Sequence, residues 1–351
     1  MSHWIEKLGI AISCGLGALL FPSGSTYAQG IPDGQGHTPV FPRTAPPTAP
    51  LRSPPQIQRD FRVTALQEDY TGDLWVGTWM GLTRINPHTG AIVARAGLPD
   101  YTLSSLAMDR SGRIWGGSYR GLVRVDPRSN ELTAYSFRLP SNRVLSLLID
   151  NRGYLWAGTD RGLALVSPDR GFLMTTLQDL PGVSANALAL DAEGQLWVGT
   201  LEGLVRVDTA SAYPIGRMTA LPGGIVQAIA TSPEGNLWVG TISGLVEIDP
   251  FKRQIIRSIR PFEGRSITSI RFANNGRVWV GSENGLFDVD PLNGEIIGQI
   301  PNLPSSRILS LSPDTGNKLW VGTSEGLAWV SPTSGLVRPH LAFIRNPPIN
   351  Y

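Results

Sequence analysis

The stretch Leu74-Trp75-Val76-Gly77-Thr78, followed by Gly81-Leu82, returns near the end of the chain as Leu319-Trp320-Val321-Gly322-Thr323 with Gly326-Leu327. Seven tryptophans mark successive copies, forty residues apart once and forty-one thereafter. They are Trp75, Trp115, Trp156, Trp197, Trp238, Trp279 and Trp320. A small sheet must stack on its neighbours to bury both faces, so a repeat of this length made of short strands is typical of a β-propeller. We predict an all-β fold: a seven-bladed β-propeller of four-stranded antiparallel blades, with a repeat of about 41 residues.

The third copy shows how one blade is built. Residues 143–150, 155–159, 162–167 and 172–177 predict four strands, here called a to d, because β-branched and aliphatic runs alternate with turn residues. The residue ten before each tryptophan is always Ala or Ser, and the next is always Leu or Ile. We expect strand a to lie innermost, where the axis leaves room only for small side chains, and the aliphatic residues to pack between blades.

The repeated tryptophans, glycines and aspartates have structural and functional interpretations. Seven identically placed indoles favour packing between blades over a set of ligand platforms. The glycines two and six residues after each tryptophan predict close approaches and turns. Calcium would need several oxygen ligands in one loop, so we interpret the single aspartate at the end of strand a as a turn cap. This aspartate occurs as Asp69, Asp109, Asp150 and Asp191.

The first 28 residues predict a secretory signal peptide. Lys7 precedes an apolar run of about 14 residues, and Thr26-Tyr27-Ala28 supplies small residues before a mature start at Gln29. A membrane anchor is the alternative, although the run is shorter than the ~20 residues of a spanning helix. A second alternative is lipidation of Cys14, the one cysteine of the chain, although the leucine expected three residues before a lipidated cysteine is absent.

Three further segments follow the signal peptide. Residues 29–57 are rich in proline and predict a flexible leader, either an extended spacer or a segment of no consequence. Residues 58–343 hold the propeller, and 344–351 form a tail. Strand a of the first blade is expected near Arg62, and strand d of the last blade over 336–342. The ring closes either by packing of blade 7 on blade 1 or by an added edge strand from Gln56-Ile57-Gln58.

The repeat resembles that of the two-component-regulator propeller family. The closest copy of its pattern is Gly194-Gln195-Leu196-Trp197-Val198-Gly199-Thr200-Leu201-Glu202-Gly203-Leu204-Val205-Arg206-Val207-Asp208. The resemblance covers about residues 61–343. It implies the seven-bladed fold and a role in extracytoplasmic recognition, since such propellers commonly sense ligands, often oligosaccharides, for membrane histidine kinases. This chain shows no kinase, no DNA-binding module and no later apolar span.

Variable side chains against the constant repeat indicate where a ligand would bind. The turns between strands b and c and the loops between strand d and the next strand a should share one face, and both vary. Their aromatic and charged residues suit a polar ligand or a protein surface, with ordinary solvated loop tips as the alternative. The predicted ligand-binding residues are Trp79, Tyr119, Arg120, Arg143, Asp160, Arg161, Glu202, Arg265, Glu283, Asn284, Arg307 and Glu325.

Catalysis has less support in the sequence. Of the four histidines, His3 and His37 precede the propeller, His88 is expected in a turn between strands c and d, and His340 near the outer edge. Streptogramin lyases share the blade number and rely on a central histidine, so a lyase or hydrolase using carboxylates such as Glu202 and Glu283 is the alternative function. Pure scaffolding through the blade rims is a third.

We predict an exported, periplasmic or extracellular, non-enzymatic monomer without cofactor or metal. Its partner would be an oligosaccharide, a peptide or a protein. The net charge of +2 gives no reason to expect nucleic acid.

Overall fold

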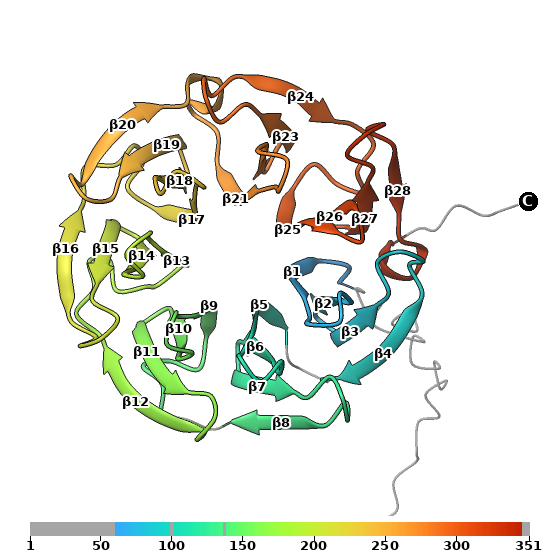
Figure 1. Ribbon diagram of the computed structural model, residues 1–351, viewed down its shortest axis with the longest axis horizontal. Helices are drawn as coiled ribbons and strands as arrows, with labels where there is room; N and C mark the ends of the chain where they lie inside the picture. The colour runs from blue at the N-terminus through green and yellow to red at the C-terminus, as the bar shows by residue number, and fades with distance from the viewer. Residues whose placement is uncertain (1–59, 99–101, 136–137, 346–351) are drawn as a thin grey trace, which may run out of the picture. The chain divides into compact units, whose positions relative to one another are not determined.

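The computed structural model describes residues 60–98, 102–135 and 138–345 (Figure 1). The chain divides into two units, Met1–Gln56 and Ile57–Tyr351, and the propeller lies in the second. The predicted signal peptide, the Pro-rich leader, the proposed edge strand at 56–58 and most of the predicted tail lie outside the described residues.

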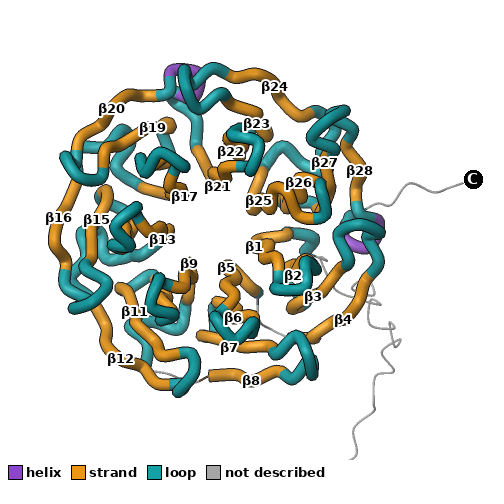
Figure 2. The backbone as a smooth tube through the Cα atoms, in the orientation of Figure 1, coloured by secondary structure: helices purple, strands orange, loops and turns teal. Residues whose placement is uncertain are grey.

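The described residues form seven four-stranded antiparallel sheets arranged as a ring, which confirms the predicted fold (Figures 1 and 2). Strand a of each blade is β1 (Val63–Glu68), β5 (Leu103–Met108), β9 (Val144–Ile149), β13 (Ala187–Leu190), β17 (Val226–Thr231), β21 (Ile267–Phe272) and β25 (Ile308–Thr315). Strand b is β2 (Leu74–Thr78), β6 (Ile114–Ser118), β10 (Leu155–Thr159), β14 (Leu196–Thr200), β18 (Leu237–Thr241), β22 (Val278–Ser282) and β26 (Lys318–Thr323).

The two outer strands of each blade complete the ring. Strand c is β3 (Gly81–Ile85), β7 (Gly121–Val125), β11 (Gly162–Ser167), β15 (Gly203–Val207), β19 (Gly244–Asp249), β23 (Gly285–Val289) and β27 (Gly326–Val330). Strand d is β4 (Ile92–Gly97), β8 (Leu132–Tyr135), β12 (Phe172–Leu177), β16 (Pro214–Met218), β20 (Gln254–Ser258), β24 (Ile296–Ile300) and β28 (Val337–Pro339). Two short 3-10 helices are η1 (Arg260–Phe262) and η2 (Leu341–Phe343).

The core lies between neighbouring blades, as the aliphatic position of strand a predicts. Leu106 of blade 2, for example, belongs to one buried cluster with Trp75 and Leu82 of blade 1. The small residue ten before the tryptophan is also explained. A Cβ on Gly158 would stand 2.2 Å from Ser146 Oγ and 2.4 Å from Ala185 O, so backbone and side chains meet there without spare room.

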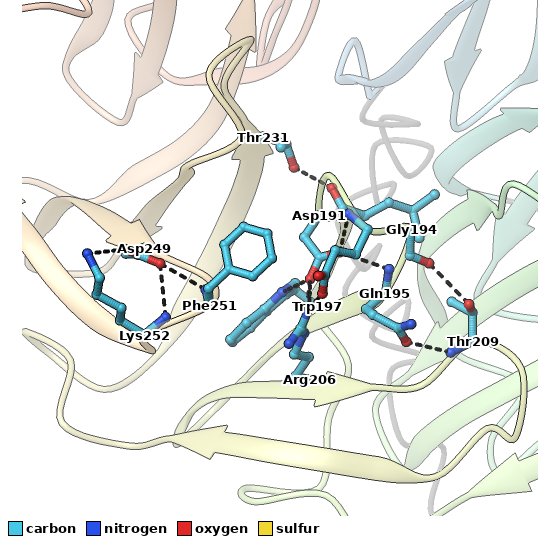
Figure 3. Close-up of polar contacts among 12 residues, drawn as sticks. Asp191, Gly194, Gln195, Trp197, Arg206, Thr209, Thr231, Asp249, Phe251 and Lys252 are labelled. Atoms are coloured by element: carbon cyan, nitrogen blue, oxygen red, sulfur yellow. Dashed lines mark hydrogen bonds and ion pairs between the residues drawn. The ribbon is translucent and has the colours of Figure 1, made fainter.

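The seven tryptophans are buried, which confirms their structural interpretation. In blade 4 the indole Nε1 of Trp197 donates to Asp191 Oδ2 (3.0 Å), and Arg206 pairs with the same carboxylate at 2.7 Å (Figure 3). Asp191 Oδ1 accepts the backbone N–H groups of Glu193 (3.0 Å) and Gln195 (2.9 Å), as a turn cap should. The carboxylate therefore holds the turn and the indole together, a second role that the spacing alone did not indicate.

Blade 7 closes on blade 1 by direct packing within the described residues. Trp320 and Leu327 share a buried cluster with Val63 and Val76, and Ser310 Oγ donates to Val63 O (3.0 Å). Lys318 Nζ adds bonds of 2.7 Å to the carbonyl oxygens of residues 87 and 88.

The prediction for the last strand d was too long. β28 covers only Val337–Pro339 instead of 336–342, and η2 follows it. Pro339 does not end the ladder, since it stands opposite Ala328 and the next residue, His340, still donates its N–H to Leu327 O (2.8 Å). The chain then turns so that His340 Nε2 lies 2.8 Å from Gly90 O of blade 1.

Candidate functional site

The b–c turns and the d–a loops share one face of the ring, here called the b–c face. Val63, at the start of β1, pairs with Thr78 at the end of β2, so the loop that enters each blade reaches the same side as the b–c turn. Backbone bonds join the two directly, as from Asp160 N to Arg143 O (3.3 Å). All of the predicted ligand-binding residues therefore lie on or beside this face.

Each b–c turn is fixed by the hydroxyl that ends strand b. In blade 3, Thr159 Oγ1 donates to Gly162 O (2.8 Å) and accepts the backbone N–H of Arg161 (3.1 Å). The same residue position makes both bonds in every blade, through Thr78, Ser118, Thr159, Thr200, Thr241, Ser282 and Thr323. The two variable side chains of each turn thus project from a constrained backbone, which favours a defined binding surface.

A cavity of about 470 Å³ opens beside the first of these turns. Half-buried Trp79 and exposed Met80 form part of its wall. Phe61 enters from the chain before β1, and Phe343 from the C-terminal η2. The other lining residues are Asp60, Thr78, Leu82, Thr83, Arg95, Ala96, Gly97 and Ala342. Residues almost three hundred positions apart along the chain therefore combine into one largely apolar hollow with a few charged groups.

A charged and aromatic group lies nearby, spread over blades 1 to 3. Asp60 and Arg62 form an ion pair. Burial opposes ionisation of Asp60, but the hydrogen bonds and charge of Arg62 outweigh it and hold the pKa of this carboxyl below its ordinary value. The bond to Asp60 raises the pKa of Arg62, to which Tyr119 also contributes. The guanidinium of Arg143 in turn lies 5.1 Å from the centre of the Tyr119 ring, so predicted residues of two blades do meet here.

The remaining predicted residues form separate groups. Glu283 pairs with Arg307 at 3.4 Å, Glu325 with Arg345 at 3.6 Å, and Arg265 lies 5.1 Å from the Phe287 ring centre. Asn284 O accepts a bond of 3.4 Å from Gln299 Nε2. Arg120, Arg161 and Glu202 are placed by their turn backbones, and Asp160 Oδ1 is buried without a hydrogen-bond partner among the described residues. Glu202 and Glu283 belong to blades 4 and 6, with blade 5 between them.

Sequence reasoning missed Arg271, which lines the central channel. This channel is a cavity of about 220 Å³ formed by the seven inner strands. Arg271 stands eight residues before Trp279, and the residues at this position in the other repeats are uncharged: Gln67, Ala107, Leu148, Ala189, Ala230 and Ser312. Comparing that column across the repeats was the signal that could have found it.

The described histidines lie away from the channel. His88 sits in the c–d turn of blade 1, and His340 packs against Phe343 with ring centres 4.9 Å apart. Within residues 60–98, 102–135 and 138–345, no three His, Cys, Asp or Glu side chains gather as a metal site would require. The same residues contain no helix long and apolar enough to span a membrane.

Comparison with known proteins agrees with the repeat and the fold. Residues 138–161, 179–202 and 220–243 match the two component regulator propeller family. Each segment runs from a d–a loop through strands a and b to the b–c turn of blades 3, 4 and 5. No curated protein sequence matches the chain.

Several solved structures share the architecture. An extracellular domain assigned to a hybrid two component system of B. thetaiotaomicron is 21% identical, with a TM-score of 0.66 over 77% of this chain. This chain spans only 40% of that structure. Virginiamycin B lyase from Staphylococcus aureus is 16% identical, with a TM-score of 0.64 over 76% of this chain and 93% of the lyase. A streptogramin B lyase is 13% identical, with a TM-score of 0.66 over 80% and 94%. At these identities the likeness establishes the fold alone.

Proposed function

We propose that this chain, which carries two-component-regulator propeller repeats, is a recognition module that binds an organic ligand on its b–c face without transforming it. The observation that carries the proposal is the Trp79 cavity, because it combines apolar walls, an aromatic platform and a few charged groups. Its volume of about 470 Å³ falls within the ~300–1,000 Å³ usual for ligand pockets. A short oligosaccharide, a peptide or one anchoring side chain of a protein partner would suit it.

The neighbouring charged group extends the site toward blades 2 and 3. Tyr119 has 46% of its surface exposed and lies under Arg143, so one ring edge is available while the guanidinium holds its orientation. A ligand that stacks on Trp79 would place polar groups toward Asp60, Arg62 and Arg143. Aromatic platforms flanked by charged hydrogen-bonding groups are typical of recognition surfaces.

We also propose that the module acts outside the cytoplasm. The predicted signal peptide at 1–28 supports export, and the extracellular domain from B. thetaiotaomicron has the same fold. Its partner outside the cytoplasm decides whether the module serves as a sensor or as a scaffold, so the identity of the ligand is to be determined first.

A lyase remains the alternative because the lyase structures share the fold. A histidine-to-alanine variant of virginiamycin B lyase bound to quinupristin is described as catalytically inactive. In this chain His88 and His340 are both distant from the channel mouth, where a central histidine would act, and Glu202 and Glu283 are held in separate blades. These placements favour binding over turnover.

The test is thermal unfolding of the chain from Gln29 onward with a panel of oligosaccharides and peptides. A ligand at ~100 times its Kd should add about 2.7 kcal/mol to the folded state. We expect Trp79→Ala with Tyr119→Ala to abolish the ligand-induced rise in Tm and to change the ligand-free Tm little, since both side chains contact the solvent. Tyr213→Ala is the matched control, because Tyr213 is 71% exposed and lies outside the b–c face. Full binding by the double variant would refute this placement.

The same ligand decides between binding and catalysis. A binding module returns the ligand unchanged after prolonged incubation, as chromatography would show. An enzyme would convert it and lose the activity with Glu202→Gln or Glu283→Gln, which would replace the present proposal.

A further inference from the structure

The seven inner strands surround the axis of the ring (Figure 2). They line a polar channel whose lining residues differ from those of the Trp79 cavity. Strand a is an edge strand in every blade, so one side of its backbone has no strand partner and faces toward the axis. Serine, threonine, asparagine and glutamine side chains add to this lining, and Arg271 is the one charged residue among the residues that line the channel.

Most of the polar side chains in the channel already have partners in the neighbouring blade. They form a closed circle of bonds that joins each blade to the next. Its members are Thr64 to Leu103 O, Ser104 to Val144 O, Ser146 to Ala185 O, Asn186 to Val226 O, Ser266 to Gln227 Oε1, Thr268 to Ile308 O and Ser310 to Val63 O. This circle explains most of the polar positions of strand a without any ligand, Ser105 and Ser269 excepted.

Arg271 does not belong to that circle. Its one bond within the described residues is from an Nη1 donor to the adjacent carbonyl, Ile270 O (2.9 Å), and no described carboxylate lies within ion-pair distance. A guanidinium has five N–H donors, so most of its donor capacity remains available. Ser269 Oγ is buried without a hydrogen-bond partner, but so is Ser105 Oγ at the equivalent position of blade 2, so this hydroxyl does not distinguish the surroundings of Arg271.

The side chain of Arg271 is exposed, so its guanidinium is in contact with the solvent of the channel. The surrounding channel walls lower the pKa of the guanidinium by desolvation. Other arginines of the propeller, such as Arg206 and Arg257, pair with carboxylates. Arg271 therefore has the position and the free donors of a residue whose counter-ion comes from outside the chain.

We propose that the central channel binds a small oxyanion, the size of phosphate or a short carboxylate, on the guanidinium of Arg271. The planar fork of arginine fits two oxygens of such an ion. The cavity of about 220 Å³ accepts such an ion and is smaller than the ~300–1,000 Å³ of pockets for larger organic ligands.

The site would lie toward the end of the channel opposite the b–c face. β21 begins on the b–c face, where Ile267 pairs with Ser282, and ends on the other side, where Phe272 pairs with Val278. Arg271 is the last residue before that end. The channel proposal therefore does not depend on ligand binding at Trp79, and either can fail without the other.

The experiment measures phosphate binding to the folded chain by calorimetry, together with Tm over a phosphate series whose ionic strength is kept constant with sodium chloride. We expect saturable binding at one site in the wild type and a Tm that rises to a plateau. Arg271→Gln should weaken phosphate binding by about tenfold or more, because a hydrogen-bonded charge is removed. Arg271→Lys should retain part of the binding. Arg170→Gln, the same change at an exposed arginine of the blade 3 c–d turn, should bind as the wild type does.

Phosphate also stabilises folded proteins because it is excluded from their surfaces. Comparison of the variants with the wild type separates this effect from binding at Arg271. An equal rise in Tm for Arg271→Gln and the wild type would identify exclusion and overturn the proposal. So would the absence of a binding isotherm in the wild type. If Arg271→Gln does not fold, the comparison is replaced by a measurement on the wild type. The width of the phosphate ³¹P resonance is followed while acetate or sulfate competes with phosphate for the protein. Lack of any broadening by the protein would then overturn it.

Discussion

Blades 1 to 4 and blades 5 to 7 bury the same tryptophan but give its surroundings different charges. In the first group an aspartate at the end of strand a accepts the indole N–H, at 2.9, 2.8, 3.1 and 3.0 Å in chain order. An arginine pairs with the same carboxylate in each of these blades, namely Arg84, Arg113, Arg152 and Arg206. The indole, the turn and the arginine thus depend on one buried side chain.

Blades 5 and 6 carry the carboxylate on another strand, whereas blade 7 keeps Asp314 at the original position. Ser232 and Ala273 replace the aspartate in blades 5 and 6, and buried Glu247 and Asp288 stand opposite the tryptophans on strand c. Arg257 and Arg277 pair with them. In blade 7 the indole of Trp320 donates instead to Thr315 O (3.2 Å). Blades 1 to 6 therefore place a carboxylate–arginine pair beside the tryptophan, on different strands in the two groups, and in blade 7 a backbone carbonyl accepts the indole N–H.

Removing the aspartate in the first group should have the largest effect on stability. Asp191→Ala leaves the Trp197 N–H without its acceptor and Arg206 with Glu193 as its remaining partner. Loss of one member of a buried ion pair costs up to about 3–5 kcal/mol. Ser232→Ala, at the equivalent position of blade 5, removes only the bond from Asn236 N (3.2 Å) and should cost about 1 kcal/mol. Urea unfolding of both variants measures the difference. Equal shifts would mean that the two kinds of blade do not differ energetically.

Converting a blade from one kind to the other should have a smaller effect. Ala273→Asp places a second carboxylate close to Asp288, and like charges repel. Adding Asp288→Arg recreates the combination of Asp191 and Arg206. We expect the two changes to be non-additive, with a favourable coupling of about 1–2 kcal/mol in a double-mutant cycle followed by chemical unfolding. Strict additivity would show that position in the blade, and not the charge pair, decides stability.

Much of the fold follows from local spacing, since each blade is a short hairpin series. The predicted strands 155–159, 162–167 and 172–177 match β10, β11 and β12. The prediction for the last strand d failed because the path of the chain there depends on the contact of His340 with Gly90 of blade 1, and blades 7 and 1 adjoin only after the ring closes. Spacing within one repeat carries no information on such a contact.

The candidate site is built throughout from contacts between residues that are distant in the sequence. Trp79 was identified as a variable turn residue, but Phe61 and Phe343 join it from the two ends of the propeller sequence. Tyr119 and Arg143 meet because blades 2 and 3 are neighbours, whereas Glu202 and Glu283 stay apart. Arg271 was overlooked because it lies in a strand that otherwise follows the structural pattern.

The smallest expected effect is a difference in how Tm depends on pH for two carboxylates, Asp288 and Asp60. Burial raises the pKa of Asp288 above its ordinary value of 3.8, against the opposing charge of Arg277. The folded state therefore favours the protonated form of Asp288. The stability gained from this protonation is present below about 3.8 and is lost as the pH rises from there through the raised pKa. Relative to Asp288→Asn, the wild type should lose Tm over this range. Asp60, whose pKa is lowered, behaves oppositely: its contribution exists above 3.8 and is lost as the pH falls below that value. Relative to Asp60→Asn, the wild type should therefore lose Tm on acidification. Tm difference curves of the same sign for both pairs would show that burial does not distinguish the carboxylate of blade 6 from the one beside the candidate site.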